Sequence, residues 1–342
     1  MKKRILLVGN FLSEAMVYGS VGEDLARRLT ARGWAVEMTS RRLGRVARLL
    51  DMVGTVVARR NHYEVAHVDV FSGPAFLWAE AACFALRRVR KPYALTLRGG
   101  NLPAFAQRWP GRVRRLLGSA RAVTSPSRYL LEQMRPYCGA IRLLTNPLEV
   151  GGYPWSVRSK PGRGLVWLRA FHEIYNPSLV PAVIAQLSDI PDLHVFMVGP
   201  DKGDGSLQRA KQRADVLGVR GRITFPGPVP KTAVPEALNR GDIFLNTANI
   251  DNTPTSVLEA MACGLCVVST NVGGIPYLLD DGNDALLVPP DDAVAMAGAV
   301  RRILQEPGLA SRLSAGGRRK VESFDWALLL PRWEELFQEL AS

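Results

Sequence analysis

The chain has 342 residues, enough for two domains of about 150 to 190 residues each. Hydrophobic residues make up 47% of it and charged residues 22%, which argues against disordered, collagen-like and coiled-coil proteins. The net charge of +13 is concentrated in one half, because residues 1–158 hold 26 Lys and Arg against 10 Asp and Glu.

Short apolar runs alternate with helical patterns throughout, which predicts an α/β protein of parallel strands joined by crossover helices. In the first half, a predicted helix over residues 21–32 ends at Gly33, a common helix stop. The strands predicted before the linker are residues 4–9, 35–39, 65–68, 93–97, 122–125 and 141–144.

Residues 153–163 are rich in Pro, Ser and Gly, which is typical of a linker. Beyond it the alternation restarts, with strands predicted at residues 164–168, 194–199, 222–225, 243–246 and 266–269. We therefore expect two doubly wound domains, residues 1–158 and 159–322, with ligands at the carboxyl ends of the strands. Residues 323–342 are predicted to form an amphipathic helix that docks on an apolar surface.

Several features speak against other classes of protein. No apolar run approaches the ~18 residues of a membrane span, and the first run ends at Gly9 before a signal-peptide core is complete. We therefore expect a cytoplasmic protein. The Arg-rich half lacks zinc-ligand spacing and a recognisable DNA-reading motif, so we expect no nucleic-acid partner. Cys263 and Cys266 have redox spacing but follow a predicted helix end, which favours packing.

The most informative stretch is a predicted strand–loop–helix over residues 243–263. Free backbone N–H groups at a helix start bind anions, so Thr255, Ser256 and Val257 are candidate phosphate ligands. Asp251 in the loop and Glu259 in the helix are carboxylates that can accept hydrogen bonds from sugar hydroxyls. The alternative is that Ser256 and Glu259 form only a capping box.

Asp251 and Glu259 stand eight residues apart, followed by Gly264 and by Gly273-Gly274-Ile-Pro. This pattern resembles the donor-binding signature of the retaining GT-B glycosyltransferases of glycosyltransferase family 4. The resemblance is dense over residues 222–290 and weaker over most of the chain. It implies two Rossmann-like domains, an acceptor-binding one and a nucleotide-sugar donor-binding one, with the last helix crossing back to the first domain.

The resemblance also implies roles for individual residues. Glu259 would hold the ribose and Asp251 the donor sugar, while Arg169 would meet the diphosphate. Gly19 and Ser20 resemble the loop that approaches the diphosphate, and Val229 follows a segment that packs on the base. Arg98, Gly99 and Gly100 resemble an acceptor-side motif.

Three positions depart from the family pattern. The first acid is usually Glu and is Asp251 here, which shortens its reach to the sugar. A basic residue expected six or seven positions after Arg169 is replaced by Tyr175 and Asn176. Arg98 stands where similar sequences often have His, and its guanidinium suits an acceptor phosphate.

No two Asp residues are separated by a single residue, as in an Asp-x-Asp metal motif, and the four His residues show no ligand spacing. We therefore expect no metal and no cofactor besides the nucleotide sugar. The leading hypothesis is a retaining hexosyltransferase acting on a lipid-linked or phosphorylated saccharide in cell-surface polysaccharide or glycolipid synthesis. A nucleotide-sugar epimerase on the same fold and a non-catalytic nucleotide-sugar-binding protein remain alternatives.

Residues 41–60 form a predicted amphipathic helix with an apolar stripe at Val46, Leu49, Leu50, Val53 and Val57. Arg41, Arg45, Arg48 and Arg59 are predicted to cluster beside it. Such a helix can lie on an anionic membrane surface, or its stripe can be buried in the domain core under a solvated Arg face. The first interpretation predicts a peripheral location at the inner face of the membrane.

Overall fold

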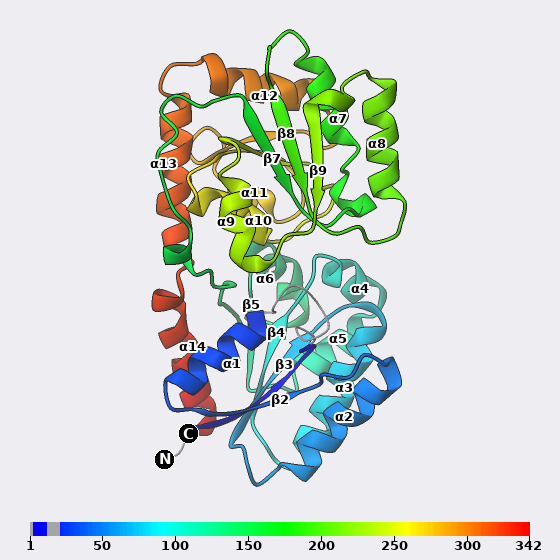
Figure 1. The fold of residues 1–342 in the computed structure, drawn as a ribbon. Helices are drawn as coiled ribbons and strands as arrows, with labels where there is room; N and C mark the ends of the chain where they lie inside the picture. The colour runs from blue at the N-terminus through cyan, green and yellow to red at the C-terminus, as the bar shows by residue number, and fades with distance from the viewer. Residues whose placement is uncertain (1–2, 12–20) are drawn as a thin grey trace. The chain divides into compact units, whose positions relative to one another are not determined.

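The computed structural model describes residues 3–11 and 21–342, which divide into two compact units (Figure 1). The first comprises Met1–Pro147 and Trp326–Ser342, and the second Leu148–Asp325. The division thus lies eleven residues before the boundary expected from the linker composition, and the last helix is part of the first unit. The predicted α/β class is confirmed, since each unit is a parallel six-stranded sheet between helices.

The sheet of the first unit has the strand order β2-β1-β3-β4-β5-β6. Every neighbouring pair is parallel. These strands are nearly continuous apolar runs because both faces of the sheet are covered. Their bounds are Arg4–Val8 (β1), Ala35–Thr39 (β2), Val65–Val70 (β3), Tyr93–Leu97 (β4), Ala122–Ser125 (β5) and Ile141–Leu143 (β6).

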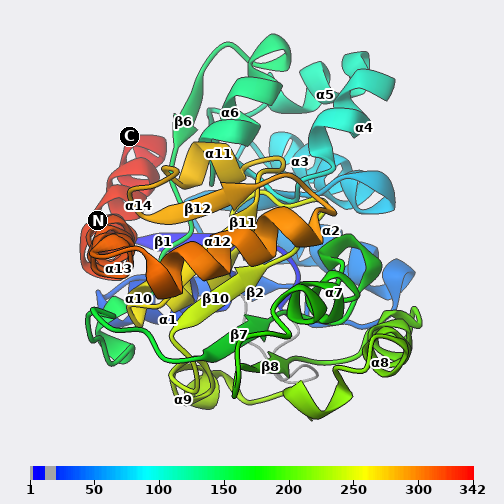
Figure 2. The ribbon, with the colours of Figure 1, turned by 90° about the horizontal axis from the view of Figure 1, so that it is seen from above.

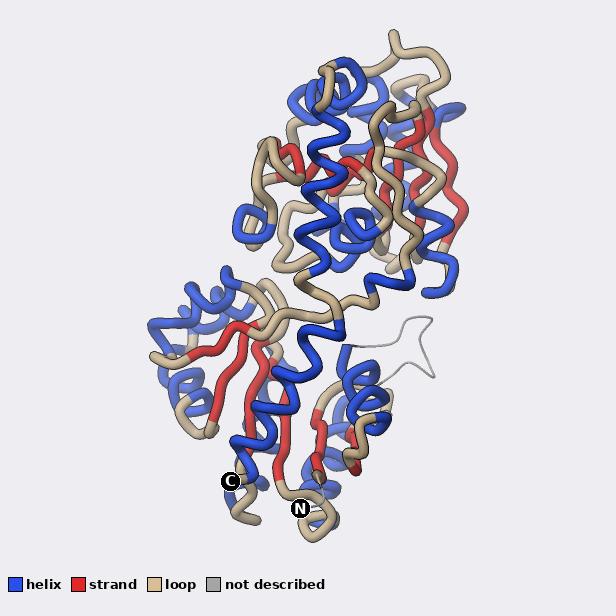
Figure 3. Tube along the Cα trace, turned by 90° about the vertical axis from the view of Figure 1, so that its left-hand side faces the viewer, coloured by secondary structure: helices blue, strands red, loops and turns tan. Residues whose placement is uncertain are grey.

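Helices from different parts of the chain cover the two faces of this sheet. The helices that pack through one core are Arg45–Ala58 (α2), Phe76–Arg88 (α3), Leu102–Arg108 (α4), Pro110–Leu117 (α5) and Arg128–Met134 (α6). The other face is covered by Val21–Ala31 (α1) and the carboxyl-terminal Trp326–Ala341 (α14). Figure 3 shows α14 lying along the strands of this sheet.

The helix α14 docks through the apolar side that its sequence pattern predicts. Trp333 and Phe337 are fully buried, and their rings meet the imidazole of His67 on β3 at 5.3 and 6.0 Å between centroids. His67 contacts Thr96 Oγ1 at 2.6 Å, and burial lowers its pKa to about 4. The imidazole is therefore neutral at pH 7, and His67 has a structural place in the core.

The second sheet has the order β12-β11-β10-β7-β8-β9, again with parallel neighbours. Figure 2 shows β12, β11, β10, β7 and β8 in this order. The edge strand β12 was missed from the sequence. The bounds are Gly164–Leu168 (β7), His194–Val198 (β8), Ile223–Gly227 (β9), Ile243–Asn246 (β10), Cys266–Thr270 (β11) and Ala285–Val288 (β12).

Two helical layers cover the second sheet. One core joins Leu179–Gln186 (α7), Ser206–Val216 (α8) and Ala293–Gln305 (α12) to the sheet. The core on the other face holds Val234–Leu238 (α9), Thr255–Ala262 (α10) and Ile275–Leu278 (α11). Leu309–Glu322 (α13) contributes to both cores. None of the helices among the described residues has the length and apolar character needed to cross a membrane.

The helix α2 corrects one sequence-based prediction. Arg48, expected beside the other arginines on the surface, is buried. Its guanidinium donates to the carbonyls of Arg42 and Leu43 and to Asn10 Oδ1, and it lies 4.9 Å from the ring of Trp78. These acceptors replace water around the guanidinium, which allows a cation to enter the interior.

We predict that Trp333→Ala destabilises the first unit by about 3 to 5 kcal/mol, because it removes a fully buried indole from the interface between α14 and the sheet. Thermal unfolding followed by near-ultraviolet circular dichroism measures this. The control is Leu328→Ala on the same helix, where the side chain is 59% exposed and the expected change is within about 0.5 kcal/mol. Equal unfolding midpoints for both variants would contradict the docking of α14.

Candidate donor site at the strand switch of the second sheet

The second sheet reverses its strand order between β7 and β10. From β7 the chain moves outward to β8 and β9, and from β10 it moves the other way to β11 and β12. Loops that leave the carboxyl ends of β7 and β10 therefore diverge, and a switch of this kind is where doubly wound sheets generally bind their ligands. Arg169 directly follows β7, and the loop of residues 247–254 follows β10. The topology thus brings together two segments about eighty residues apart.

Arg169 and Asp251 form a buried ion pair at this point. The guanidinium Nη2 of Arg169 donates to Asp251 Oδ2, and the two side chains are only 11% and 10% exposed. Arg169 Nη1 lies 3.4 Å from Ser256 Oγ, at the start of α10. Its Nε is buried and has no hydrogen-bond partner among the described residues. The guanidinium therefore has one N–H donor that no described residue accepts from.

The ionisation of Asp251 reflects opposing effects. Burial raises the pKa of the Asp251 carboxyl above its ordinary value, while Arg169 and a 2.9 Å hydrogen bond from the Asn252 N–H act in the opposite direction. Burial outweighs both. The carboxylate consequently depends on Arg169 to stay charged, and any ligand that takes the guanidinium changes the environment of Asp251.

The ring of Tyr175 supports Arg169 from one side, with the guanidinium carbon 4.0 Å from the ring centroid. Tyr175 is itself fixed, because its carbonyl accepts a hydrogen bond of 2.7 Å from Thr247 Oγ1. Thr247 in turn accepts from the indole of Trp167 at 2.9 Å. Tyr175 stands where the family pattern has a basic residue. In this chain an aromatic ring, and not a second cation, thus lies against Arg169.

The start of α10 supplies backbone donors. The helix begins at Thr255 after Pro254, whose carbonyl accepts from the amides of Val257 and Leu258 at 3.2 and 3.3 Å. The Val257 amide is thus engaged, and the candidate anion donors are the amides of Thr255 and Ser256. The capping-box alternative is wrong, because Ser256 is the second residue of the helix and not its N-cap.

Two glycines hold the loop that carries Asp251. The Gly274 N–H donates to the Asp251 carbonyl at 3.0 Å. A Cβ atom at Gly273 or Gly274 would lie 2.2 or 2.0 Å from the carbonyl oxygen of Asp251 or Asn252. Any larger residue would displace this loop, which explains the Gly-Gly pair physically.

Glu259 of α10 is buried, and its carboxylate has two hydrogen-bond partners that the sequence did not indicate. Its Oε1 accepts a 2.8 Å hydrogen bond from the Tyr153 hydroxyl and a second one from the Lys231 ammonium. Glu259 is 4% exposed, whereas the Lys231 side chain is 50% exposed. Because these partners lie 106 and 28 residues away, no local spacing could have revealed them. Val229, two residues before Lys231, is half-buried against the core beneath α10.

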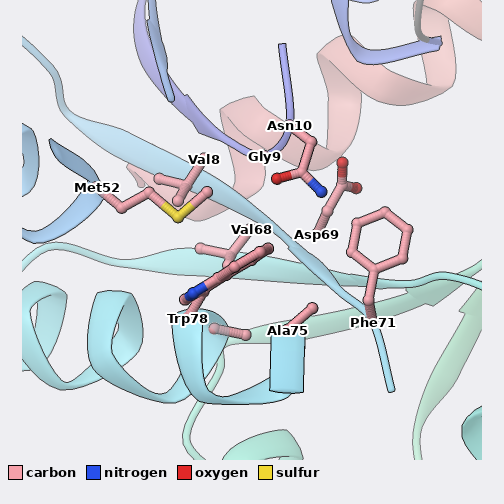
Figure 4. A pocket seen from close by; sticks show the side chains of 10 residues that line it. Val8, Gly9, Asn10, Met52, Val68, Asp69, Phe71, Ala75 and Trp78 are labelled. Atoms are coloured by element: carbon pink, nitrogen blue, oxygen red, sulfur yellow. The ribbon is translucent and has the colours of Figure 1, made fainter. Parts of the chain in front are cut away.

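The first sheet has a strand switch of its own, between β1 and β3. A small pocket lies there (Figure 4), lined by Gly9 and Asn10 after β1, by Asp69 and Phe71 from β3 and the segment after it, and by Trp78 of α3. A Cβ atom at Gly9 would stand 2.9 Å from Asp69 Oδ2, so a larger residue there would displace the Asp69 carboxylate. The space is only about 10 Å³, enough for about one water molecule, so these carboxylate, amide and indole groups would have to move apart before a larger ligand could contact them.

Arg98 lies beside this pocket and is already paired. Its Nε donates to Asp69 Oδ1 at 2.8 Å and its Nη1 to Asn146 Oδ1 at 2.6 Å. Gly99 has a φ of +82°, which favours glycine, and Gly100 follows in the turn before α4. A role for these three residues toward an acceptor stays a prediction. Gly19 and Ser20 lie outside the described residues.

No group of three or more His, Cys, Asp or Glu side chains within residues 3–11 and 21–342 is arranged to hold a metal ion. Cys263 and Cys266 are buried, and burial raises the pKa of each thiol to about 12. The thiolate form that redox chemistry needs is therefore strongly disfavoured. Both cysteines pack in the core.

Comparison with known proteins relates part of the second unit to a family. Residues 167–306, which contain Arg169, Asp251 and Glu259, match the family model described as "Glycosyl transferases group 1". This segment is a glycosyl transferases group 1 domain. The predicted relation to this family is confirmed for the part of the chain that carries the candidate donor site.

Curated relatives match over part of the chain. A D-inositol 3-phosphate glycosyltransferase of Streptomyces bingchenggensis is 29% identical over 154 residues, which are 43% of this chain and 34% of that relative. A phosphatidyl-myo-inositol mannosyltransferase of Mycolicibacterium smegmatis is 28% identical over 181 residues, 52% of this chain and 44% of the relative. The chain thus spans about a third to less than half of the length of these two relatives.

Solved structures match over nearly the whole chain. A sucrose-phosphate synthase of Thermosynechococcus elongatus superimposes with a TM-score of 0.81 at 19% identity, covering 99% of both chains. HepE of Anabaena, solved in complex with UDP and glucose, gives 0.76 at 15% identity, covering 98% of this chain and 100% of that one. The predicted GT-B fold is confirmed.

We predict that Arg169→Met destabilises the second unit by about 3 kcal/mol at pH 7, because Asp251 is then buried without its cation. The loss of Arg169 raises the pKa of Asp251 further. A carboxyl whose pKa is raised on folding binds its proton more tightly in the folded state, so stability is lost as pH rises. The deficit should therefore be smaller at pH 4 than at pH 7.

Unfolding midpoints of the variant and the parent across this pH range measure the effect. The double variant Arg169→Met with Asp251→Asn is the control, since it removes the buried charge together with its partner. Its stability should depend on pH less steeply than that of Arg169→Met, because no carboxyl titrates at position 251. A deficit in Arg169→Met that does not change with pH would contradict the ion pair.

Proposed function

We propose that this protein is a retaining, metal-independent glycosyltransferase. It transfers a hexose-type sugar from a nucleoside-diphosphate sugar to a lipid-linked or phosphorylated saccharide acceptor, in the synthesis of a cell-surface polysaccharide or glycolipid. The observation that carries this proposal is the convergence of Arg169, Asp251 and the start of α10 at the strand switch of a glycosyl transferases group 1 domain.

The donor fits the chemistry of these groups. The Arg169 guanidinium and the amides of Thr255 and Ser256 are groups that bind the negative charge of a diphosphate. Glu259 is placed four residues beyond the helix start and would accept hydrogen bonds from ribose hydroxyls. Asp251 would accept hydrogen bonds from the sugar. The nucleotide is supported by the UDP bound in the related HepE structure.

In the transfer step, the bond between the anomeric carbon and the diphosphate oxygen breaks, and charge grows on the leaving diphosphate. Arg169 and the helix amides stabilise this charge, which is usually the largest electrostatic contribution to catalysis. The acceptor oxygen bonds to the anomeric carbon on the face that the diphosphate leaves, and the acceptor proton passes to a departing phosphate oxygen. Configuration is therefore retained.

Binding of the diphosphate by Arg169 has a consequence for Asp251. The guanidinium that pairs with Asp251 must turn at least one N–H group toward the phosphate. Its Nε has no partner among the described residues but is buried, so the side chain must shift before this N–H can reach a phosphate. In the ligand-free protein, the ion pair with Asp251 and the ring of Tyr175 together hold the Arg169 guanidinium in one orientation.

The acceptor class is supported by the relatives, which include transferases to D-inositol 3-phosphate and to phosphatidyl-myo-inositol. Both acceptors combine a polyol with a phosphate. In this chain, the pocket beside β1 and β3 offers Asn10 and Asp69 to hydroxyls, and Arg98 lies next to it. We place the protein in the cytoplasm, with its acceptor unit at the inner face of the membrane.

A panel of radiolabelled nucleoside-diphosphate sugars tests the activity, first for hydrolysis and then for transfer to inositol phosphate and lipid-linked saccharides. We expect one donor to be turned over and an α-linked donor to give an α-linked product by nuclear magnetic resonance. Binding without turnover would favour the non-catalytic alternative. Release of an isomerised sugar would favour an epimerase, and an inverted product would refute retention.

We predict that Glu259→Gln weakens binding of the nucleoside-diphosphate donor by about 1 to 3 kcal/mol, because the ribose hydroxyls lose a charged acceptor. Calorimetric titration measures the affinity, and circular dichroism checks the fold. Glu236→Gln on α9 is the matched control, since Glu236 is exposed. Equal affinities for the parent and Glu259→Gln would leave Glu259 with only its structural bonds to Tyr153 and Lys231.

A second prediction of the proposed function is that transfer survives an excess of EDTA. The cationic groups available for the diphosphate are an arginine and backbone amides, and they need no divalent ion. Initial rates with EDTA, and with added Mg²⁺ or Mn²⁺, measure the dependence. Loss of activity in EDTA that Mn²⁺ or Mg²⁺ restores would mean that the diphosphate is neutralised by a metal.

A further inference from the structure

Much of the apolar stripe of α2 faces solvent. Val46 and Leu50 are 72% and 68% exposed, Val57 is 40% exposed, and Leu43 just before the helix is 69% exposed. At about 100° per residue, Val46, Leu50 and Val57 lie within about 40° of one another on the helix. We call these four residues the α2 ridge. Of the predicted stripe, Leu49 and Val53 are half-buried and Val53 packs against the core, whereas the ridge is exposed. The expectation that the whole stripe is buried in the core is therefore wrong.

The α2 helix reaches the core through other residues. Met52 and Val56 are buried against the sheet, and Arg48 is bonded to the loop before the helix and stacked on Trp78 of α3. The helix therefore folds without any need for the ridge. Since exposed aliphatic side chains on one helix face gain nothing from folding, they point to contact with another apolar phase.

Arginines stand at both ends of the ridge. Residues 41–60 contain six Arg and one acidic residue, Asp51. Asp51 accepts a hydrogen bond of 3.1 Å from Thr39 and points to a different side of the helix. Arg42 and Arg45 are exposed at the amino-terminal end, and Arg59 and Arg60 at the other. The ridge thus lies between two groups of cations.

The neighbouring helix adds to the same side of the first unit. α3 packs against α2 and covers the same face of the sheet (Figure 1). Its Leu77 and Phe84 are 52% and 53% exposed and stand seven residues apart, so they lie on one helix face. The guanidinium of Arg88 lies 5.0 Å from the Phe84 ring. Aliphatic, aromatic and cationic groups thus occur together on this side.

We infer that the α2 ridge and its flanking arginines dock this protein on a membrane surface of anionic lipids. At the surface of such a membrane, aliphatic side chains can insert among the acyl chains while arginines bind the negative headgroups. A nucleic acid has phosphates for the arginines but no apolar region for the ridge. The charge of the surrounding half, +16 over residues 1–158, matches such a surface. The inference deepens the proposed function by naming the partner of the acceptor unit, and its motivation rests on that function.

Sedimentation of the full chain with vesicles tests the docking without any donor. We expect binding to vesicles of 70% phosphatidylcholine and 30% phosphatidylglycerol in about 50 mM NaCl, and strongly reduced binding in about 500 mM NaCl because the headgroup attraction is screened. Vesicles of phosphatidylcholine alone should bind at least about tenfold less, since each basic residue near an anionic surface contributes about fivefold.

Two sets of variants separate the ridge from the arginines. Leu50→Asp should reduce vesicle binding at least about tenfold at both salt concentrations, because an apolar contact is lost. Arg42→Glu with Arg45→Glu should reduce it at low salt and flatten the salt dependence. Arg48 is left unchanged because it is buried. Each variant must keep the unfolding midpoint of the parent.

Matched controls come from α8 of the second unit. Val216 is 85% exposed, so Val216→Asp places the same charge on an exposed apolar site. Arg209→Glu with Arg213→Glu reverses two exposed arginines. Both controls should bind vesicles as the parent does. Equal losses in the α8 and α2 variants would show an unspecific charge effect and overturn the inference.

Other outcomes also overturn it. A parent protein that stays in the supernatant with anionic vesicles at low salt does not dock on such lipids. Self-association without vesicles that Leu50→Asp abolishes would make the ridge an interface between copies of this chain. Failure of the proposed function is distinguishable, because it would appear as absent donor turnover while vesicle binding by the parent and its loss in the variants remain.

Discussion

Parallel strands can be joined only by connections that cross back over the sheet, and this constraint places the candidate site residues of both units. When successive crossovers start from the middle of a sheet and proceed to opposite edges, two adjacent loops separate at the carboxyl ends. β7 and β10 have this relation in the second sheet, and β1 and β3 have it in the first. Arg169 and Asp251 meet because of the first switch, and Asp69 with Asn10 because of the second.

The side chains at the two strand switches differ in their chemical groups. In the second unit a buried arginine stands on an aromatic ring beside backbone amides, which is an environment for concentrated negative charge. In the first unit the arginine beside the pocket is neutralised by Asp69 and bonded to Asn146, while the pocket itself offers carboxylate, amide and indole groups. The proposed function assigns the diphosphate to the former and the hydroxyl groups of the acceptor to the latter. The division of a transfer reaction between two units is consistent with this difference.

The sequence predicted the elements because each one carries its own local pattern. Eleven strands and the last helix were recognisable from apolar runs and a 3.6-residue period. β12 was missed although Ala285–Val288 is itself an apolar run, because a run of only four residues does not distinguish a strand from a helical or loop segment. Within the site, Asp251 and Glu259 were recognisable from their spacing on one loop and helix. Tyr153, Lys231 and Asp69 were not, because a hydrogen bond between distant segments leaves no trace in either segment alone.

The arrangement of α2 shows what the helical period of a sequence cannot predict. The period gives the angle between side chains on the helix, but not which side meets the sheet. Here Arg48 turns inward because two carbonyls, an amide oxygen and an indole satisfy its guanidinium, and Met52 with Val56 completes the buried side. That choice leaves Val46, Leu50 and Val57 outside. A stripe of aliphatic residues in a sequence therefore identifies an apolar face of a helix. Whether that face is turned to the core or to solvent depends on the polar groups that neighbouring side chains of the helix, such as Arg48, can bond to.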